Sequence, residues 1–361
     1  MNIIDGYVNN EKHFLSYNIF IMYKWNLTFM QMHIMRAESE RVEKIMNTEL
    51  ITIGEAMIVF IAENEGEFTD IESFSKGIAG AELNVCIGLS RLGNKVSYIT
   101  RLGDDVFGRH IENIIHKEGI GADQITFDGD YSTGFYFKTK VKDGDPKVHY
   151  FRKNSAACQL SCTDIENADF TGAKVLHITG ITAALSESSR EAVYAAIEKA
   201  RANNMLVTFD PNIRVQLWKS EAHMAEVLND IASKCDIVLP GIKEGAMLTG
   251  KETKEEIADF YLNNGAKAVI IKDGAKGAYL KTLEEEKMVA GFKIDKVVDT
   301  VGAGDGFATG VLSGILDGLS YEEAVTRGNA IGARMVTSKE DNEFLPIKAE
   351  LEDFMASHER Y

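Results

Sequence analysis

From Leu50 onward, short apolar runs alternate with longer amphipathic segments, and this alternation limits the possible folds more than any other feature of the chain. The clearest apolar runs have the length of buried strands and cover residues 96–100, 175–178, 206–210, 237–239 and 268–272. Intervening segments such as 188–203 and 221–234 repeat apolar residues every three or four positions, which is typical of amphipathic helices. Strands alternating with helices predict an α/β fold with a parallel sheet.

Two stretches, about 57–78 and 126–153, break this alternation. Within the second, residues 133–141 alternate polar and apolar side chains, which favours half-exposed strands. We expect the two stretches to form a small separate sheet. Because they are inserted between core units, this sheet is expected to act as a lid that excludes water from a cleft.

The two ends of the chain differ from its middle. An apolar and aromatic stretch at 14–30 is interrupted by Asn18, Lys24 and Asn26, so it does not reach the ~20 apolar residues of a membrane span. It is also not followed by the small-residue cleavage site of a signal peptide. We expect translation to start at Met46, with residues 1–45 a disordered arm or start-site artefact. The folded domain is then predicted at 46–350, followed by a tail at 351–361.

Charge and cysteine content limit the partners. The net charge of −16 argues against binding a polyanion, which requires clustered Lys and Arg. The four cysteines form no CxxC pair, so they indicate neither a zinc site nor a disulfide framework. We expect reduced thiols, a cytoplasmic location, and no nucleic-acid or membrane partner.

The most specific segment is a strand at 297–301 that turns through glycines into a helix. A helix start presents free backbone N–H groups and the positive end of the helix dipole, which suit a phosphoryl group. A dinucleotide fingerprint would need glycine where this chain has Phe307, and a P-loop would need a terminal Gly-Lys-Ser/Thr that is absent. Both usual phosphate-binding motifs are therefore disfavoured.

Asp305 lies at this helix start, where a substrate hydroxyl could meet both the acid and the transferring phosphate. Phosphoryl transfer depends on positioning and charge stabilisation, with a carboxylate accepting the hydroxyl proton. We predict that Asp305 is the general base and that the amides of Gly302, Ala303, Gly304 and Asp305 stabilise the transferring group. The alternative is a helix N-terminal acid without chemistry, with Gly310 and Gly314 serving only close helix packing.

Residues 299–305 match the Asp-Thr-x-Gly-Ala-Gly-Asp signature, and with it the chain resembles the ribokinase family of carbohydrate kinases over residues 48 to about 350. The resemblance implies a three-layer α/β/α sandwich with a mostly parallel central sheet and a small β-sheet lid. It also implies a sugar kinase that uses ATP with Mg²⁺.

A second family signature at 77–84 is followed by a helix rich in small residues. The resemblance implies that residues from this signature, the lid and later loops contact the sugar. These are Gly80, Ala81, Asn84, Tyr136, Tyr150, Arg152, Arg214, Asp305 and Asp341.

The nucleotide residues are likewise implied by the resemblance. They are Asn212, Arg214, Lys272, Asp273, Gly274, Ala275, Lys276, Gly277, Gly302, Ala303, Gly304, Asp305 and Asn329. Glu244 is implied as an outer-shell metal group. Gly241 replaces the asparagine of the family's Asn-x-x-Glu motif there, so the role of Glu244 stays open.

Arg152 and Arg214 in one cleft would favour a substrate with a carboxylate, because a guanidinium pairs with it bidentately. Residues 150–157, 210–214 and 239–241 resemble most closely the members that phosphorylate 2-keto-3-deoxygluconate. Fructose and 5-dehydro-2-deoxygluconate stay open as acceptors within the family. The expected partners are a small sugar acid, ATP and further copies of the chain in a homo-oligomer.

Two alternatives come from other functional classes. The chain could be a sugar or nucleotide sensor that keeps the fold without the chemistry, although the presence of Asp305 argues against this. A dinucleotide-dependent dehydrogenase is disfavoured by Phe307.

Overall fold

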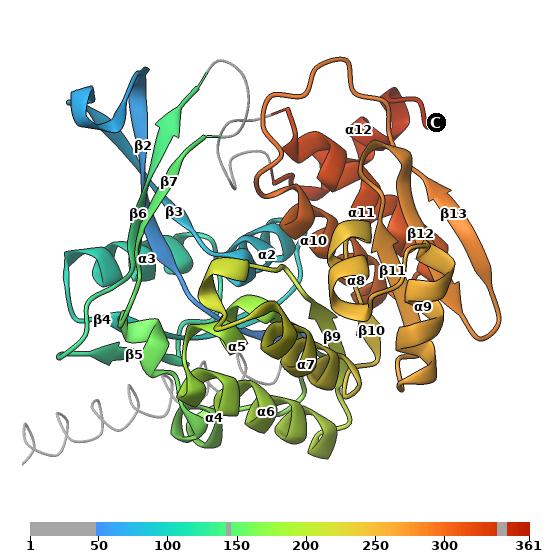
Figure 1. Cartoon of the computed structure of the whole chain (residues 1–361), viewed down its shortest axis with the longest axis horizontal. Coiled ribbons are helices and arrows are strands. Elements are labelled where there is room, and N and C mark those ends of the chain that lie inside the picture. Colours follow the sequence, from blue (N-terminus) through green and yellow to red (C-terminus); the bar gives the residue numbers. More distant parts are fainter. Residues whose placement is uncertain (1–47, 142–145, 338–344) are drawn as a thin grey trace, which may run out of the picture. The chain divides into compact units, whose positions relative to one another are not determined.

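The computed structural model describes residues 48–141, 146–337 and 345–361, and its main feature is a nine-stranded sheet (Figure 1). Its strands are β1 (Leu50–Ile53), β4 (Val96–Gly103), β5 (Ile125–Asp128), β8 (Val175–Thr179), β9 (Leu206–Asp210), β10 (Ile237–Val238), β11 (Ala268–Lys272), β12 (Gly277–Thr282) and β13 (Glu286–Ala290). Their order is β13-β12-β11-β10-β9-β8-β1-β4-β5. The pairs from β11 to β5 are parallel, and β12 and β13 add an antiparallel edge.

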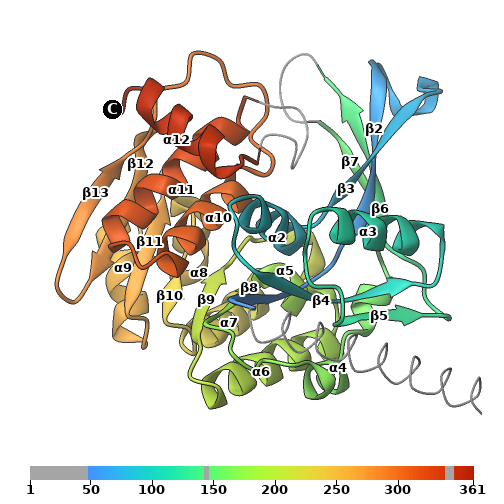
Figure 2. The ribbon, with the colours of Figure 1, turned by 180° about the vertical axis from the view of Figure 1, so that it is seen from behind.

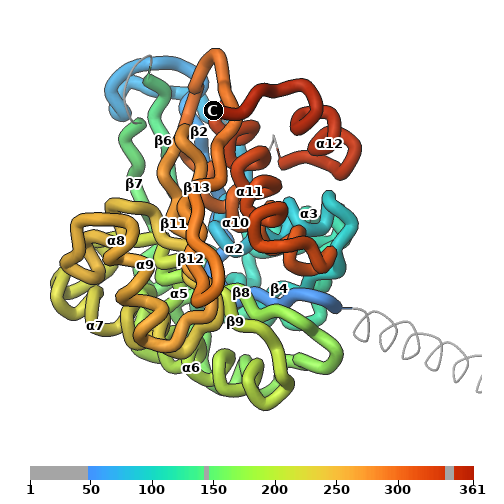
Figure 3. The backbone as a smooth tube through the Cα atoms, turned by 90° about the vertical axis from the view of Figure 1, so that its right-hand side faces the viewer, coloured from blue at the N-terminus to red at the C-terminus, as the bar shows by residue number. Residues whose placement is uncertain are grey.

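Helices cover both faces of this sheet (Figures 2 and 3). One layer contains α2 (Ala81–Arg91), α3 (Val106–Lys117), α10 (Ala303–Leu316), α11 (Tyr321–Met335) and α12 (Lys348–Ser357). The other contains α4 (Cys162–Asn167), α5 (Gly180–Leu185), α6 (Glu187–Ala202), α7 (Glu221–Ala232), α8 (Ile242–Thr249) and α9 (Lys254–Asn263). The predicted three-layer α/β/α sandwich is confirmed.

Alternation along the buried strands produces two cores, one on each face. In β11, Ala268 and Ile270 belong to the core that includes residues of α10 and α11, whereas Val269 and Ile271 belong to the core that includes residues of α7 and α9. Such strands have no polar face, which is why they appear in the sequence as continuous apolar runs. The five predicted strands are present, and 206–210 and 268–272 have the predicted bounds. The predicted helices 188–203 and 221–234 are α6 and α7.

A separate four-stranded sheet, here called the small sheet, lies beside the main one (Figure 1). Its strands are β2 (Met57–Glu65), β3 (Phe74–Ala79), β6 (Phe135–Lys140) and β7 (Val148–Phe151). The two predicted stretches therefore do form a small sheet. The predicted start of the second stretch was wrong, because 126–128 belong to β5, which pairs in parallel with β4 in the main sheet.

At the C-terminal side, α12 crosses the boundary at 350 that we predicted between domain and tail. Leu351 and Phe354 are buried in the core, and Arg360 forms a β-bridge with Phe292. Residues 351–361 are thus packed onto the domain, and the compact unit extends to Tyr361. The predicted arm at 1–45 lies outside the described residues. Among the helices that the structure describes, none is long and apolar enough to cross a membrane.

Candidate active site

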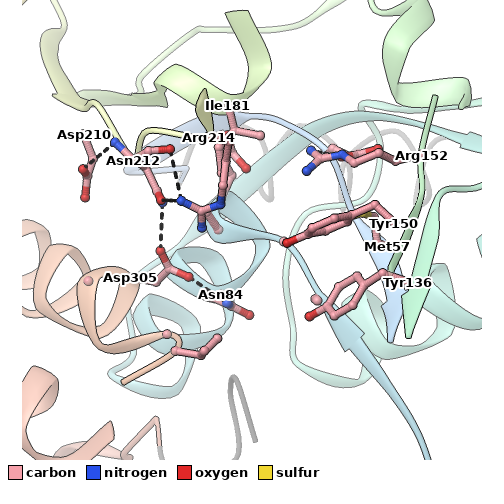
Figure 4. A pocket seen from close by; sticks show the side chains of 18 of the residues that line it. Met57, Asn84, Tyr136, Tyr150, Arg152, Ile181, Asp210, Asn212, Arg214 and Asp305 are labelled. Carbon is pink, nitrogen blue, oxygen red and sulfur yellow. Dashed lines mark hydrogen bonds and ion pairs between the residues drawn. The ribbon is translucent and has the colours of Figure 1, made fainter. Parts of the chain in front are cut away.

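The carboxyl ends of the parallel strands converge at one edge of the main sheet, which is where ligands bind in open α/β sheets. Glu55 follows β1, Asp210 ends β9 and Lys272 ends β11. A cavity of about 380 Å³, here called the first cavity, opens between this edge and the small sheet (Figure 4). Its lining includes Glu55, Met57, Gly80, Ala81, Glu82, Asn84, Tyr136, Tyr150, Arg152, Asp210, Asn212, Arg214, Glu244, Lys272, Gly302, Gly304 and Asp305.

Asp305 lies in the first turn of α10 and faces this cavity. One carboxylate oxygen accepts a hydrogen bond from Asn84 Nδ2 at 2.8 Å, and the other from Asn212 Nδ2 at 3.3 Å (Figure 4). Burial raises the pKa of Asp305 to about 7, against the lowering effect of the Asn84 hydrogen bond. A carboxylate held by two amides, with a pKa near neutrality, has the properties of a general base.

The helix start before Asp305 has the backbone geometry of an anion site. Gly302 has φ of 77°, a left-handed conformation that glycine adopts without strain. The N–H of Ala303 donates to the carbonyl of Thr300 at 3.3 Å, so this amide is already engaged. Gly304 and Asp305 occupy first-turn positions, whose N–H groups have no acceptor within a helix. Of the four amides that we predicted to bind the phosphoryl group, that of Ala303 is thus engaged within the turn, and those of Gly302, Gly304 and Asp305 stay the candidates.

A buried cation lies beside this helix start. Lys272 Nζ donates to both oxygens of Asp210, at 2.7 and 2.9 Å, and is 3.9 Å from Glu244 Oε2. Burial opposes the charge of Lys272, but the carboxylates of Asp210 and Glu244 raise its pKa, so the ammonium remains protonated. A Cβ on Gly304 would lie 3.8 Å from Lys272 Nζ, which places the ammonium close to the helix start.

Glu244 serves a local structural role in addition to lining the cavity. Its two carboxylate oxygens accept the N–H groups of Gly241 at 2.7 Å and Ile213 at 2.8 Å. It thereby caps α8 and ties the loop after β9 to that helix. Within the described part of the chain, no three or more His, Cys, Asp or Glu side chains group together in a way that could hold a metal ion.

The small sheet supplies the opposite wall of the first cavity. Tyr136 on β6 and Tyr150 on β7 are cross-strand neighbours with ring centroids 5.2 Å apart. Arg152, which follows β7, forms a buried ion pair with Glu55, and Ser155 Oγ donates to Glu55 at 3.0 Å. The charge of Arg152 is therefore already balanced within the protein.

Arg214 is in a different electrostatic situation. It donates to Asn212 Oδ1 at 2.7 Å and to two backbone carbonyls, all of which are neutral acceptors (Figure 4). In the described residues it forms no ion pair, so its charge is available to a ligand. The same contact fixes the Asn212 amide so that its nitrogen points to Asp305, with the Asn212 backbone in a left-handed conformation at φ of 38°.

A second cavity of about 330 Å³ adjoins the first on the other side of the 300–304 segment. The two share Lys272, Thr300 and Gly304. The walls of the second cavity are mostly apolar, and Asn329 is held there by bonds from Nδ2 to the carbonyls of Val289 and Ala290. Its lining is Lys272, Gly274, Ala275, Gly277, Gly291, Phe292, Ile294, Val297, Thr300, Ala303, Gly304, Phe307, Asn329, Gly332, Ala333, Val336 and Tyr361.

The structure thus brings together most of the residues predicted from the sequence. The predicted sugar residues line the first cavity, except Asp341, which lies outside the described residues. The predicted nucleotide residues divide between the cavities: Asn212 and Arg214 lie in the first, whereas Asn329 and most of the 272–277 loop lie in the second. Asp273 and Lys276 line neither cavity and lie 3.7 Å apart as an ion pair.

Several lining residues were missed. Glu55 and Asp210 could have been found, because each stands at the carboxyl end of a strand of the parallel sheet. Glu82 is fully buried in the first turn of α2, where it accepts hydrogen bonds from the hydroxyls of Thr179 and Thr182. Tyr361 carried no local signal, since only the return of the chain along Gly291 and Phe292 brings it to the second cavity.

Comparison with known sequences supports a single family. The model described as pfkB family carbohydrate kinase matches residues 47–348. The chain is 45% identical over 313 residues to a 2-dehydro-3-deoxygluconokinase of Bacillus subtilis, covering 86% of this chain and 97% of that protein. It is 32% identical to a probable fructokinase-5 of Arabidopsis thaliana, covering 86% and 98%.

Solved structures agree in fold. A PfkB protein from Polaromonas sp. JS666 superposes with a TM-score of 0.78 at 44% identity, covering 84% of this chain and 99% of that one. A putative ribokinase II from E. coli, in complex with ATP and Mg²⁺, gives a TM-score of 0.78 at 27% identity, covering 86% and 100%.

Proposed function

The chain belongs to the pfkB family of carbohydrate kinases, and from this premise we propose that it transfers the γ-phosphoryl group of ATP to 2-keto-3-deoxygluconate, giving the 6-phosphate. The observation that carries the proposal is the meeting of two cavities at the start of α10. Asp305 faces the first cavity, and Gly304 and Lys272 line both. A hydroxyl in the first cavity and a triphosphate reaching from the second would meet at the helix start and the base.

The choice of a sugar acid rests on charge. Among the described residues, Arg214 has only neutral hydrogen-bond acceptors, whereas Arg152, on the opposite wall of the cavity, is already paired with Glu55. A carboxylate on the substrate would complete the bonding of Arg214 bidentately. The relative from Bacillus subtilis, which is more similar to this chain than the Arabidopsis protein, is named for a sugar acid. This is a further reason to place a sugar acid ahead of a neutral ketose.

In the proposed reaction, the primary hydroxyl of the sugar loses its proton to the Asp305 carboxylate and its oxygen forms a bond to the γ-phosphorus. The bond from that phosphorus to the oxygen bridging the β-phosphate breaks, and ADP leaves. Asn84 and Asn212 hold the Asp305 carboxylate in place for this transfer. The amides of Gly302, Gly304 and Asp305, together with the Lys272 ammonium, stabilise the charge on the transferring group.

The residues present also fit the Mg²⁺ that accompanies ATP. The carboxylates of Asp210 and Glu244 lie beside Lys272, where the two cavities meet, and could hold the waters of such an ion. Bound Mg²⁺ neutralises charge on the phosphate oxygens. Glu244 is assigned to the outer shell, since both its oxygens already accept backbone N–H groups.

The direct test is ATP consumption with Mg²⁺ and, separately, 2-keto-3-deoxygluconate, 5-dehydro-2-deoxygluconate, fructose and ribose. We expect the highest kcat/KM with 2-keto-3-deoxygluconate. Preference for fructose would overturn the sugar-acid assignment but leave the kinase chemistry. Absence of turnover with every sugar, together with tight sugar or nucleotide binding, would instead favour a sensor.

The acid limb of the pH profile reports the ionisation of Asp305. Because burial raises its pKa from 3.8 to about 7, the base becomes protonated, and inactive, as the pH falls through neutrality. We expect kcat/KM to fall by about tenfold per pH unit below this value, as for a single essential base. Asn84→Leu removes a hydrogen bond that lowers the pKa, so the limb should move to higher pH. A profile flat to pH 5 would contradict the assignment.

Tyr361 is expected to form one wall of the nucleotide site. Its backbone N–H donates to the Gly291 carbonyl at 3.1 Å, and its side chain lines the second cavity while remaining 63% exposed. Tyr361→Ala should raise KM for ATP by about 2- to 10-fold, the value of an aromatic contact, and leave KM for the sugar unchanged. Tyr361→Phe should retain the wild-type KM. Tyr131→Ala, at an exposed position lining neither cavity, is the matched control.

A further inference from the structure

Lys138 connects the small sheet to the loop that begins the phosphate site. It lies on β6 two residues after Tyr136, and side chains two apart on a strand point to the same face. Tyr136 lines the first cavity. Lys138 Nζ lies 2.8 Å from Asp299 Oδ2, and the two side chains are only 6% and 17% exposed. One strand thus contacts both the acceptor cavity and the segment leading to α10.

Asp299 also forms a hydrogen bond with the turn that follows it. Its other carboxylate oxygen, Oδ1, accepts the N–H of Val301 at 3.0 Å. Burial opposes the charge of Asp299, but the hydrogen bonds from Lys138 and the Val301 amide lower its pKa. The turn leads directly to Gly302, and Thr300 lines both cavities. The Asp299 carboxylate therefore contacts Lys138 of the small sheet through one oxygen and the turn at 299–302 through the other.

The backbone before the turn is anchored elsewhere. The N–H groups of Val298 and Asp299 both donate to the carbonyl of Val336, just after α11, at 2.7 and 3.3 Å. For the turn at 300–302, the connection to the small sheet that the described residues show runs from the Val301 N–H through the Asp299 carboxylate to Lys138. The conformation of the turn should therefore depend on the Asp299 side chain.

We propose that Lys138 is a positioning residue, which orders the 299–302 turn through Asp299 and so couples sugar binding at the small sheet to ATP binding at the start of α10. This coupling rests on the proposed function of the two cavities. A sugar bound against Tyr136 and Tyr150 holds β6 and β7, and with them Lys138, against the loop. An ordered loop then presents its amides to the phosphates, so each substrate strengthens the binding of the other.

The first experiment needs no substrate. Amide hydrogen exchange of a peptide covering 299–302 is measured in the ligand-free full chain, in Lys138→Met, in Asp299→Asn and in Lys140→Met. Lys140 lies on the same face of β6, and its Nζ donates to the Glu63 carbonyl, so it is the matched control. Exchange should be faster in the first two variants and unchanged in the third. Equal exchange in Lys138→Met and Lys140→Met would overturn the proposal.

The second experiment measures coupling. The Kd of a non-hydrolysable ATP analogue is determined with and without 2-keto-3-deoxygluconate. Binding should tighten by about 5-fold or more in the unmodified chain and in Lys140→Met, the lower end of typical coupling between sites. In Lys138→Met the two Kd values should agree within about twofold, and Lys138→Arg should restore the difference. An unchanged ratio of the Kd without sugar to the Kd with sugar in Lys138→Met would overturn the proposal. A partly unfolded variant would bind less analogue under both conditions, so its remaining folded fraction would keep the ratio.

The two experiments separate this inference from the proposed function. If the unmodified chain phosphorylates none of the sugars, the proposed function fails, and the exchange experiment still decides whether Lys138 orders the turn. If the chain is an active kinase but Lys138→Met resembles Lys140→Met in both experiments, only the inference about Lys138 fails. Should Lys138→Met not fold, Asp299→Asn removes the same ion pair from the loop side and carries both measurements.

Discussion

Asp305→Asn is expected to lower kcat by about 10²- to 10⁴-fold, the usual contribution of a positioned general base. Asparagine has the same shape but cannot take the proton of the sugar hydroxyl. One of its contacts must also change, because Asn84 and Asn212 both present Nδ2 to this side chain, and an amide has a single acceptor oxygen. Steady-state kinetics with a coupled ADP assay measures the loss, and calorimetry should show sugar and ATP affinity within a few-fold of wild type.

The melting temperature of Asp305→Asn shows whether a lower kcat comes from losing the base or from unfolding. The folded-state pKa of Asp305 is raised to about 7, so ionising it is unfavourable in the folded protein. That cost is absent well below pH 4 and is complete above pH 7. Asp305→Asn removes it, so the variant should melt at the same or a higher temperature at pH 8. Asp317→Asn, the same change at the other end of α10, should leave kcat unaltered. A loss of kcat below tenfold for Asp305→Asn would remove this residue as the base.

Arg214→Met is expected to lower kcat/KM for 2-keto-3-deoxygluconate by about 30- to 3,000-fold, which corresponds to 2 to 5 kcal/mol for truncating one partner of a buried charge pair. The guanidinium forms no ion pair with the residues that the structure describes, although its charge lowers the pKa of Asp305. The part of the loss that is specific to a sugar acid therefore reflects the ligand's carboxylate. Arg152 is a poorer test, because its removal leaves Glu55 buried without its ion-pair partner and destabilises the fold.

Comparison with a neutral sugar isolates the carboxylate effect. Arg214 also orients the Asn212 amide toward Asp305, and losing that support should slow turnover of every sugar. Asn212→Ala removes the support but keeps the guanidinium, so it should affect fructose and 2-keto-3-deoxygluconate alike. Arg190→Met, which changes an arginine outside both cavities, controls for lost positive charge. If Arg214→Met reduces kcat/KM equally for both sugars, Arg214 does not hold the carboxylate.

The fold could be predicted well because its signals are local. Apolar runs bounded by polar turns mark strands that are buried on both faces, and β9 and β11 have the predicted bounds. The turn into α10 was also readable, since a left-handed glycine and a helix start are consecutive at Gly302 and Ala303. The strand that we predicted at 297–301 was wrong, because Val298 and Asp299 both donate their N–H groups to the Val336 carbonyl instead of pairing with a strand. The other errors fell on boundaries. The local sequence pattern predicts neither the pairing of 126–128 with β4 nor the packing of α12 onto the domain.

By itself, the sequence determined the layered α/β fold, the small sheet, the helix start and the identity of the candidate base, because each depends on residues close together in the chain. Only the tertiary structure decided how these groups act on one another. Asn84 and Asp305 are 221 residues apart, yet their hydrogen bond orients the Asp305 carboxylate. The same holds for the pairing of Arg152 with Glu55, the link from Lys138 to Asp299, and the approach of Tyr361 to the second cavity. The charge and orientation of a buried group depend on its neighbours in space, and a local pattern does not specify those neighbours.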